Sequence, residues 1–175
     1  HIMDFNKDTM TVSYCNIPLG TDGNKASICD ENGNLLFFTN GRAVMDANLS
    51  IITNGSDIND GEWARRYWPD PGYGFPGFQN IMILPDPKSP SGFYLIHKTP
   101  VYNPPAKDSI EIRYSYIENY VHNNTSEVTI KNKKFYKKND LLGGFLTAIR
   151  HQNQKDWWIL QPVLGEQIIT FLLDD

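Results

Sequence analysis

The sequence lacks both a basic excess and a long apolar run, and each absence excludes a class of partner. Its 16 Lys and Arg against 20 Asp and Glu give a formal net charge of −4. Nucleic-acid binders need a clustered basic surface for phosphate contacts, so no nucleic-acid partner is expected. No apolar run reaches the roughly 20 residues that a helix needs to cross a bilayer, so no membrane insertion is expected. The one basic run, five lysines within 131–138, is interpreted as a solvated strand edge.

Cysteine is scarce as well. The chain has two, Cys15 and Cys29, each inside a strand-like segment. Neither belongs to a Cys-x-x-Cys motif or has a histidine nearby in sequence, so zinc binding and thiol catalysis are not expected. No cofactor is expected. A disulfide requires that the two strands be neighbours with suitable geometry. A disulfide and a pair of buried free thiols therefore both remain open.

Helical periodicity is almost absent. The apolar stretches are short, rich in β-branched and aromatic residues, and bounded by Gly, Pro, Asn and Asp. That pattern predicts an all-β protein. Only 60–67 and the neighbourhood of 140–142 have the pattern of a short helical turn. The predicted strands are 9–15, 25–29, 35–39, 43–45, 50–53, 79–84, 93–98, 110–117, 128–136, 146–151, 157–162 and 167–173.

A strand, a polar turn and an aromatic-rich strand recur in units that start near 26, 81 and 146, 55 and then 65 residues apart. A hairpin alone cannot bury both of its faces, so we expect one domain, 1–175, of stacked antiparallel β-sheet blades, as in a β-propeller. Two to three repeats cannot close a ring of about four to eight blades. The sequence also starts His1-Ile2-Met3 and stops inside an apparent strand. We therefore expect a fragment of a larger propeller, or else an open β assembly.

Several segments resemble a known family. The segment 30–41, DENGNLLFFTNG, resembles the D-x-x-G-N-L-L-F-Y-T-N-G start of a blade in large surface proteins of the Bacteroidota. The segment 93–97, FYLIH, is similar to their Y-Y-L-F-H strand, and LTAIRH at 146–151 with DWW at 156–158 is similar to their L-T-A-x-R-H…D-W-W segment. The resemblance runs from about 21 to 173.

This resemblance implies an N-terminal β-propeller-like region of a secreted or cell-surface protein. In that family such a region precedes further β domains and a sorting domain for type IX secretion, so the rest of a larger polypeptide is expected. The family's molecular function is poorly defined, and it offers no catalytic motif to carry over. The resemblance therefore implies a fold and an extracytoplasmic location rather than an activity.

Two polar features are interpreted as structural. The oxygen-rich stretch 30–34 lacks the spacing of a calcium loop, because apolar residues follow it at once, and a hairpin turn with Asn-Gly explains it better. His97 and His151 stand on or at the end of repeat strands, where a neutral imidazole can hydrogen-bond to a neighbouring blade. Arg150 and His151 are also candidates for a buried polar pair with Asp156 or with Asp30.

The segment 56–78, which we call the aromatic loop, interrupts the repeats. Its aromatic density argues against disorder, and long loops in compact domains are usually functional. Flat aromatic faces beside arginine donors suit a glycan or a protein surface. The alternative is that these rings fold inward and cap a blade. The predicted ligand-binding residues are Trp63, Arg65, Arg66, Tyr67, Trp68 and Tyr73.

Catalytic motifs are missing: the sequence has no G-x-S-x-G and no zinc-protease helix, so no catalytic residue is predicted. The leading hypothesis is a non-enzymatic extracytoplasmic binding or scaffold module. One alternative is an extracytoplasmic hydrolase or lyase on a propeller scaffold, whose acids and histidines converge only in three dimensions. The acids around the loop are Asp57, Asp60, Glu62 and Asp70. Another is a structural spacer of a large adhesin.

Overall fold

The structure is a computed structural model and describes residues 2–4, 9–14, 16–20, 23–102, 104, 109–120, 125–141 and 143–175. In chain order its elements are β1 (Ile2–Asp4), β2 (Thr11–Ser13), β3 (Ala26–Cys29), β4 (Leu35–Thr39), β5 (Val44–Asp46), α1 (Glu62–Tyr67), the 3-10 turn η1 (Pro71–Tyr73), β6 (Ile81–Pro85), β7 (Gly92–Val101), β8 (Ser109–Tyr120), β9 (Thr125–Lys138), β10 (Thr147–Arg150), β11 (Trp157–Val163) and β12 (Gln167–Leu173).

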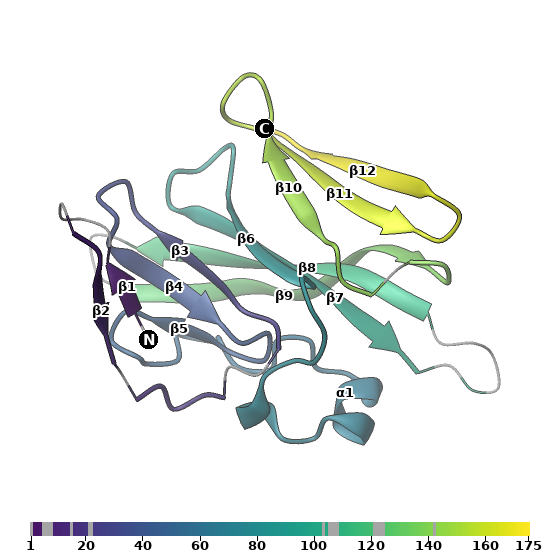
Figure 1. The fold of residues 1–175 in the computed structure, drawn as a ribbon, viewed down its shortest axis with the longest axis horizontal. Helices are drawn as coiled ribbons and strands as arrows, with labels where there is room; N and C mark the ends of the chain where they lie inside the picture. The colour runs from purple at the N-terminus through teal and green to yellow at the C-terminus, as the bar shows by residue number, and fades with distance from the viewer. Residues whose placement is uncertain are drawn as a thin grey trace.

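These strands form antiparallel meanders, and within each sheet a strand pairs with the next one along the chain (Figure 1). Sheet 1 is β3-β4-β5, sheet 2 is β6-β7-β8-β9 and sheet 3 is β10-β11-β12, while β1 and β2 pair separately. The predicted all-β class is confirmed. Each predicted repeat unit is the first hairpin of one of these sheets. No sheet in the described part of the chain closes on itself, and a propeller arrangement stays a prediction.

Most predicted strands are present to within a few residues, but the strand at 50–53 is wrong. This segment makes only isolated bridges, one from Ile51 to Met45 and one from Thr53 to Glu127. Left-handed residues bracket it, with φ of 62° at Leu49 and 56° at Asn54. The chain therefore turns too soon to extend either bridge into a ladder.

The two predicted helical turns have different outcomes. The one at 60–67 is confirmed as α1. The one at 140–142 is wrong: Leu141 forms an antiparallel bridge with Val163 of β11, and Leu164 N donates to Asp140 O at 2.9 Å. This pairing holds the backbone in a turn followed by an extended residue, while Leu142 lies outside the described residues.

Sheet 2 is packed on both faces. Ile81 and Ile83 of β6 belong to a core shared with sheet 1, whose residues include Phe37 and Val44. Leu84, on the opposite face, belongs to a second core shared with sheet 3. Because successive strand residues point to opposite faces, a strand covered on both sides reads as a continuous apolar run. The run at 81–84 is explained by this double packing.

Polar links also join consecutive sheets at the points where their first strands begin. Asn80 N, just before β6, donates to Asn24 Oδ1, just before β3, at 2.8 Å. Gly144 N, ahead of β10, donates in turn to Asn80 Oδ1 at 2.7 Å. The asparagine before each of the first two sheets thus accepts a backbone hydrogen bond from the next sheet along the chain. These bonds fix how the sheets are stacked.

A buried lysine of β7 also joins sheets 2 and 3, close to the link at Gly144. The ammonium group of Lys98 donates to Gly144 O and, at 2.7 Å, to Gln161 Oε1 of β11. Burial lowers the pKa of Lys98 to about 8. Lys98 and Gln161 are both almost fully inaccessible, so their hydrogen bonds satisfy groups that would otherwise destabilise the interior.

The tryptophans of β11 lie on opposite faces of sheet 3, as expected for adjacent strand residues. Trp157 packs in the core shared with sheet 2 and donates from Nε1 to Pro85 O at 3.2 Å. Trp158 lies on the other face and is exposed. Sheet 3 is therefore buried on one side only.

The predicted buried pair of Arg150 and His151 is wrong. Arg150 is exposed, with its guanidinium 4.5 Å from the ring centre of Trp157 and Nη1 donating to Gln154 O at 3.0 Å. His151 Nδ1 accepts from Asn153 N at 3.2 Å. Both side chains make these contacts within the β10–β11 hairpin, because its tight turn brings the partner residues close.

Three smaller predictions concern the surface. The turn at 30–34 is confirmed: Gly33 has a φ of 81°, and Asp30 Oδ1 accepts from Asn32 N and Asn34 N. The lysine run lies on β9, an edge strand of sheet 2, as predicted. Cys29 is a free thiol and exposed, not buried, and Cys15 lies outside the described residues.

The core between sheets 1 and 2 gives a stability prediction. Ile117 is fully buried in it, so Ile117→Ala should lower the free energy of unfolding by about 2–5 kcal/mol through lost burial and a residual cavity. Ile130→Ala, at an exposed site on β9, should change it by less than about 1 kcal/mol. Urea unfolding measures both, and equal effects would contradict this packing.

Candidate binding site

The aromatic loop connects sheet 1 to sheet 2 along the chain, and its helix α1 lies below the sheets in the view of Figure 1. The helix has only six residues, and its N-cap, Gly61, provides no side-chain hydrogen bond. Ala64 is its one buried residue. An isolated helix of this length is unstable in water, so tertiary contacts must hold it. Those contacts come from the polar residues that flank it.

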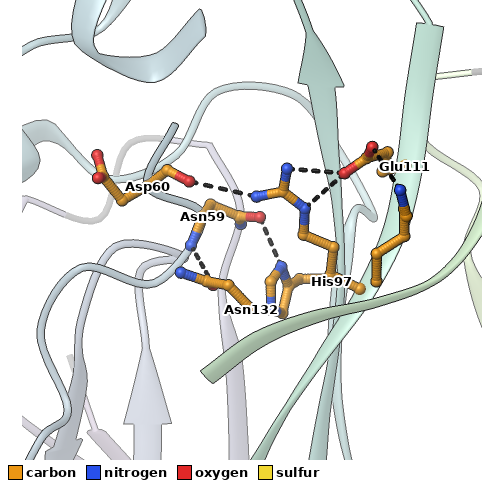
Figure 2. Close-up of polar contacts among 7 residues, drawn as sticks. Asn59, Asp60, His97, Glu111 and Asn132 are labelled. Carbon is orange, nitrogen blue, oxygen red and sulfur yellow. Dashed lines mark hydrogen bonds and ion pairs between the residues drawn. The ribbon is translucent and has the colours of Figure 1, made fainter. Parts of the chain in front are cut away.

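A buried polar network, which we call the anchor network, fixes the start of the loop (Figure 2). His97 Nδ1 lies 2.5 Å from Asn59 Oδ1, and His97 Nε2 lies 3.2 Å from Ser115 Oγ. Asn132 N donates to Ser115 Oγ at 3.0 Å, and Asn132 Oδ1 accepts from Asn59 N at 2.9 Å. These four residues, Asn59, His97, Ser115 and Asn132, close a ring of hydrogen bonds between the loop and β7, β8 and β9 of sheet 2.

The hydrogen bonds determine the state of His97. Asn59 Nδ2 donates to Gly41 O at 3.2 Å, so Asn59 Oδ1 is the acceptor and the histidine carries its proton on Nδ1. Nε2 then accepts from the Ser115 hydroxyl. Burial, reinforced by the positive charge of Arg113, lowers the pKa of His97 to about 3. The imidazole is neutral and structural, as the sequence predicted.

Ser115, His97 and Asn59 resemble the nucleophile, the base and the orienting amide of a catalytic triad, but they cannot act as a triad. Ser115 and His97 are both fully inaccessible to solvent, so no substrate reaches the hydroxyl. A general base is most effective when its pKa lies near the working pH, and that of His97 is far below it. The arrangement therefore holds the loop in place and does not perform nucleophilic catalysis.

Charged residues hold the next part of the loop (Figure 2). Arg113 Nη1 donates to Asp60 O at 3.2 Å, while its Nη2 pairs with Glu111 at 2.7 Å. Lys134 lies 3.6 Å from the other oxygen of Glu111. The Asp60 carboxylate pairs with Arg65 of α1 at 2.5 Å. The entrance to the helix is thus fixed to β8 by a partly buried arginine.

Beyond these anchors, aromatic rings gather around α1. Trp63 lies 5.7 Å from Tyr67 and 5.9 Å from Phe75, measured between ring centres. Tyr67 lies 6.0 Å from Tyr102, which follows β7, and the guanidinium of Arg66 lies 4.7 Å from the Tyr102 ring centre. We call Trp63, Arg66, Tyr67 and Tyr102 the aromatic cluster.

The structure brings together three of the six predicted ligand-binding residues, namely Trp63, Arg66 and Tyr67. Arg65 is exposed but pairs with Asp60. Trp68 is half-buried, and its Nε1 has no hydrogen-bond partner in the described part of the chain. Tyr73 lies on η1 and is 58% exposed.

Sequence reasoning missed Tyr102 as a member of the site. The sequence signal for Tyr102 was a second proline-rich segment at the end of β7. Whether Tyr102 lies close to Tyr67, however, depends on how that segment and the aromatic loop fold. The loop aromatics differ in burial, and the predicted inward capping is seen for one of them. Phe75 is buried against Gly41 as a cap, whereas Tyr67 is 49% exposed.

Three of the four candidate acids of the aromatic loop, Asp57, Asp60 and Asp70, are engaged separately. Asp57 accepts from Ser56 Oγ at 3.0 Å, and Asp70 accepts from Gly72 N at 2.8 Å. Asp60 pairs with Arg65, so the described contacts show no pairing of these acids for acid–base catalysis.

A groove of about 380 Å³ lies where the first strands of the three sheets begin, away from the aromatic cluster. None of the described residues that line it is an acid or a histidine. Its walls are Gly23, Asn24, Lys25, Phe78, Gln79, Ile81 and Leu146.

Comparisons with known proteins add no relative: no protein-family model, no curated protein and no solved structure matches the chain. Among the residues described, no three His, Cys, Asp or Glu side chains are grouped so that they could hold a metal ion. No helix within the same residues has the length and apolar character needed to cross a membrane.

The anchor network predicts how the loop responds to mutation. Asn59→Ala leaves the His97 Nδ1–H unpaired in the interior, which should cost about 1–3 kcal/mol of unfolding free energy. It should also speed tryptic cleavage at Arg65 and Arg66, because α1 loses its support. Asn48→Ala, at an exposed asparagine, is the control. Equal cleavage rates in the two variants would show that the network does not hold the loop.

The lowered pKa of His97 predicts a pH dependence of stability. Its pKa falls from 6.5 to about 3 on folding, so the unfolded chain binds a proton over this window and the folded chain does not. The stabilisation is complete above pH 6.5 and is lost as pH falls, by up to about 1.4 kcal/mol per pH unit. His97→Gln should flatten the curve between pH 6.5 and 4, relative to wild type and to His151→Gln. Parallel curves for all three would refute the buried neutral state.

Proposed function

We propose that the chain is a non-enzymatic binding module whose aromatic loop contacts a glycan, through the aromatic cluster and through Tyr73 on η1. The observation that carries this proposal is a set of partly exposed rings and an arginine on a loop whose start is anchored to sheet 2 by hydrogen bonds. Tyr67 and Tyr73 present exposed ring faces, and Arg66 adds a forked donor beside Tyr102. Apolar sugar faces pack on aromatic rings while their hydroxyls accept from guanidinium groups.

Support at the start of the loop favours binding over a purely spacer role. Ordering a loop on binding costs conformational entropy, and a loop held in advance avoids part of that cost. The anchor network and the Arg113–Asp60 bond hold this loop without using any of its exposed rings. A glycan is preferred to a protein partner because a standard protein interface covers about 800 Å² per partner, far more than a few rings.

We further propose that the three sheets are successive blades of a propeller-like region in a larger extracytoplasmic protein, as the resemblance to Bacteroidota surface proteins implies. The outer face of sheet 3 supports this. Ile149, Trp158 and Leu172 stand directly opposite one another there, and all three are exposed. A further sheet packed on this row would bury it as sheet 3 buries the equivalent face of sheet 2.

A glycan array tests the binding proposal. Wild type should bind one class of glycan, and Tyr67→Ala and Tyr73→Ala should each weaken that binding by roughly 10-fold, since stacking on one aromatic ring contributes about 1–2 kcal/mol. Tyr120→Ala is a matched control at an exposed tyrosine at the end of β8.

The binding profile of the Tyr120→Ala control should equal that of wild type. Wild type that binds no glycan, or loop variants that bind as wild type does, would reject the aromatic cluster as the binding surface. Circular dichroism spectra of all four proteins should agree, because neither tyrosine of the loop is buried.

A further inference from the structure

Arg42 is a buried arginine whose guanidinium is not satisfied. It lies in the turn between β4 and β5, and only 4% of its surface is exposed. Neither Nε nor Nη1 has a hydrogen-bond partner in the described part of the chain. Buried arginines are almost always paired, since an isolated charge in the interior is costly. An orphaned guanidinium in a folded protein therefore calls for a partner from outside.

The backbone of Arg42 lies against the aromatic loop. Its carbonyl accepts from Ile58 N at 3.0 Å, and the preceding carbonyl, of Gly41, accepts from Asn59 Nδ2 at 3.2 Å. A Cβ at Gly41 would lie 2.7 Å from Phe75 Cβ, so the loop also covers this turn from its far end. Arg42 is thus enclosed between sheet 1 and the loop that carries the aromatic cluster.

The face of sheet 2 beneath the same loop is polar and buried. Along β8, Ile117 belongs to the apolar core, but the residues that follow on the same face toward α1 are Ser115, Arg113, Glu111 and Ser109. Ser115, Glu111 and Ser109 are buried. A buried polar face normally has its groups satisfied, yet Ser109 Oγ has no partner among the described residues.

The charges in this region do not cancel. Arg113 is paired with Glu111, and Lys134 adds a second, weaker contact to the same carboxylate. No carboxylate among the described residues pairs with Arg42. Arg42 Nε and Nη1 are therefore buried donors without a partner in the described part of the chain. A guanidinium presents its N–H donors as a planar fork, which suits an anion with two acceptor oxygens, such as a carboxylate.

We propose that Arg42 is the charge-recognition residue of the binding site and takes the carboxylate of an acidic sugar, a uronic acid. This inference rests on the proposed glycan-binding function and names its ligand class. The aromatic cluster stacks one sugar ring while the carboxylate of an adjoining residue enters beneath the loop. Arginine matches a carboxylate with two parallel hydrogen bonds, which sets orientation as well as affinity.

Arg42 is only 4% exposed, so a ligand reaches its guanidinium only if part of the aromatic loop moves. The helix has one buried residue, no side-chain N-cap and exposed arginines, so few apolar contacts hold it down. Segments with few buried contacts open at the lowest cost. The anchor network stays in place during such a movement, because it lies ahead of the helix at Asn59.

Binding of a charged and an uncharged form of one sugar tests the proposal. The probes are a trisaccharide of galacturonic acid and its fully methyl-esterified form, titrated calorimetrically at pH 7. Wild type should bind the acid at least about tenfold more tightly than the ester. Arg42→Met should bind the two equally, and Arg42→Lys should lie between. The control Arg150→Met, at an exposed arginine of sheet 3, should behave as wild type.

A stability measurement separates this role from a structural one. An unpaired buried cation destabilises the fold, so Arg42→Met should raise the melting temperature by a few degrees. A lowered melting temperature would overturn the proposal, because it would mean that the guanidinium has a partner within the protein.

The binding outcomes are equally distinct. Equal wild-type affinities for acid and ester, both lost in Tyr67→Ala, would overturn the role of Arg42 and leave the aromatic cluster as a glycan site. Binding of neither sugar would reject both proposals. Binding of a hexaglutamate peptide in place of the acidic trisaccharide would overturn the sugar assignment.

Discussion

The neutral, fully buried imidazole of His97 is the constraint on which the candidate site depends. A histidine in the interior is tolerated only when it is uncharged and both ring nitrogens are satisfied. One nitrogen uses the sheet, through Ser115, and the other uses the loop, through Asn59. The requirement to satisfy one buried ring therefore determines where the aromatic loop leaves sheet 1, and hence where the aromatic cluster stands.

The interface between sheets 1 and 2 changes character along its length. At one end apolar residues such as Leu95 and Ile117 pack against Phe37 and provide most of the burial energy. At the other end the same face of sheet 2 carries hydroxyls and charges, and the aromatic loop covers them. A polar interface contributes less to stability than an apolar one, but it can exchange its partners for those of a ligand. Arg42 lies at this polar end.

Stacked meanders also explain why the repeats could be recognised in the sequence. Each unit begins with a hairpin that packs on a neighbouring sheet, and the hairpin of sheet 2 packs on two, so that both of its faces are apolar. The segment at 50–53 shows the limit of this reasoning, because its residues have strand character but no ladder to join. Local propensity predicted an extended backbone there, but whether a partner strand lies beside it depends on the tertiary structure.

The sequence by itself determined the all-β class, the hairpin of each repeat and the presence of an aromatic loop with a short helical turn. These follow from the spacing of apolar residues and from turn residues, which act within a few positions of each other. Only the tertiary structure decided that Tyr102 joins Tyr67, that His97 meets Asn59, and that Arg42 is buried without a partner. Each of these depends on contacts between segments far apart in the chain, and no local pattern records which polar groups folding brings together or leaves unpaired.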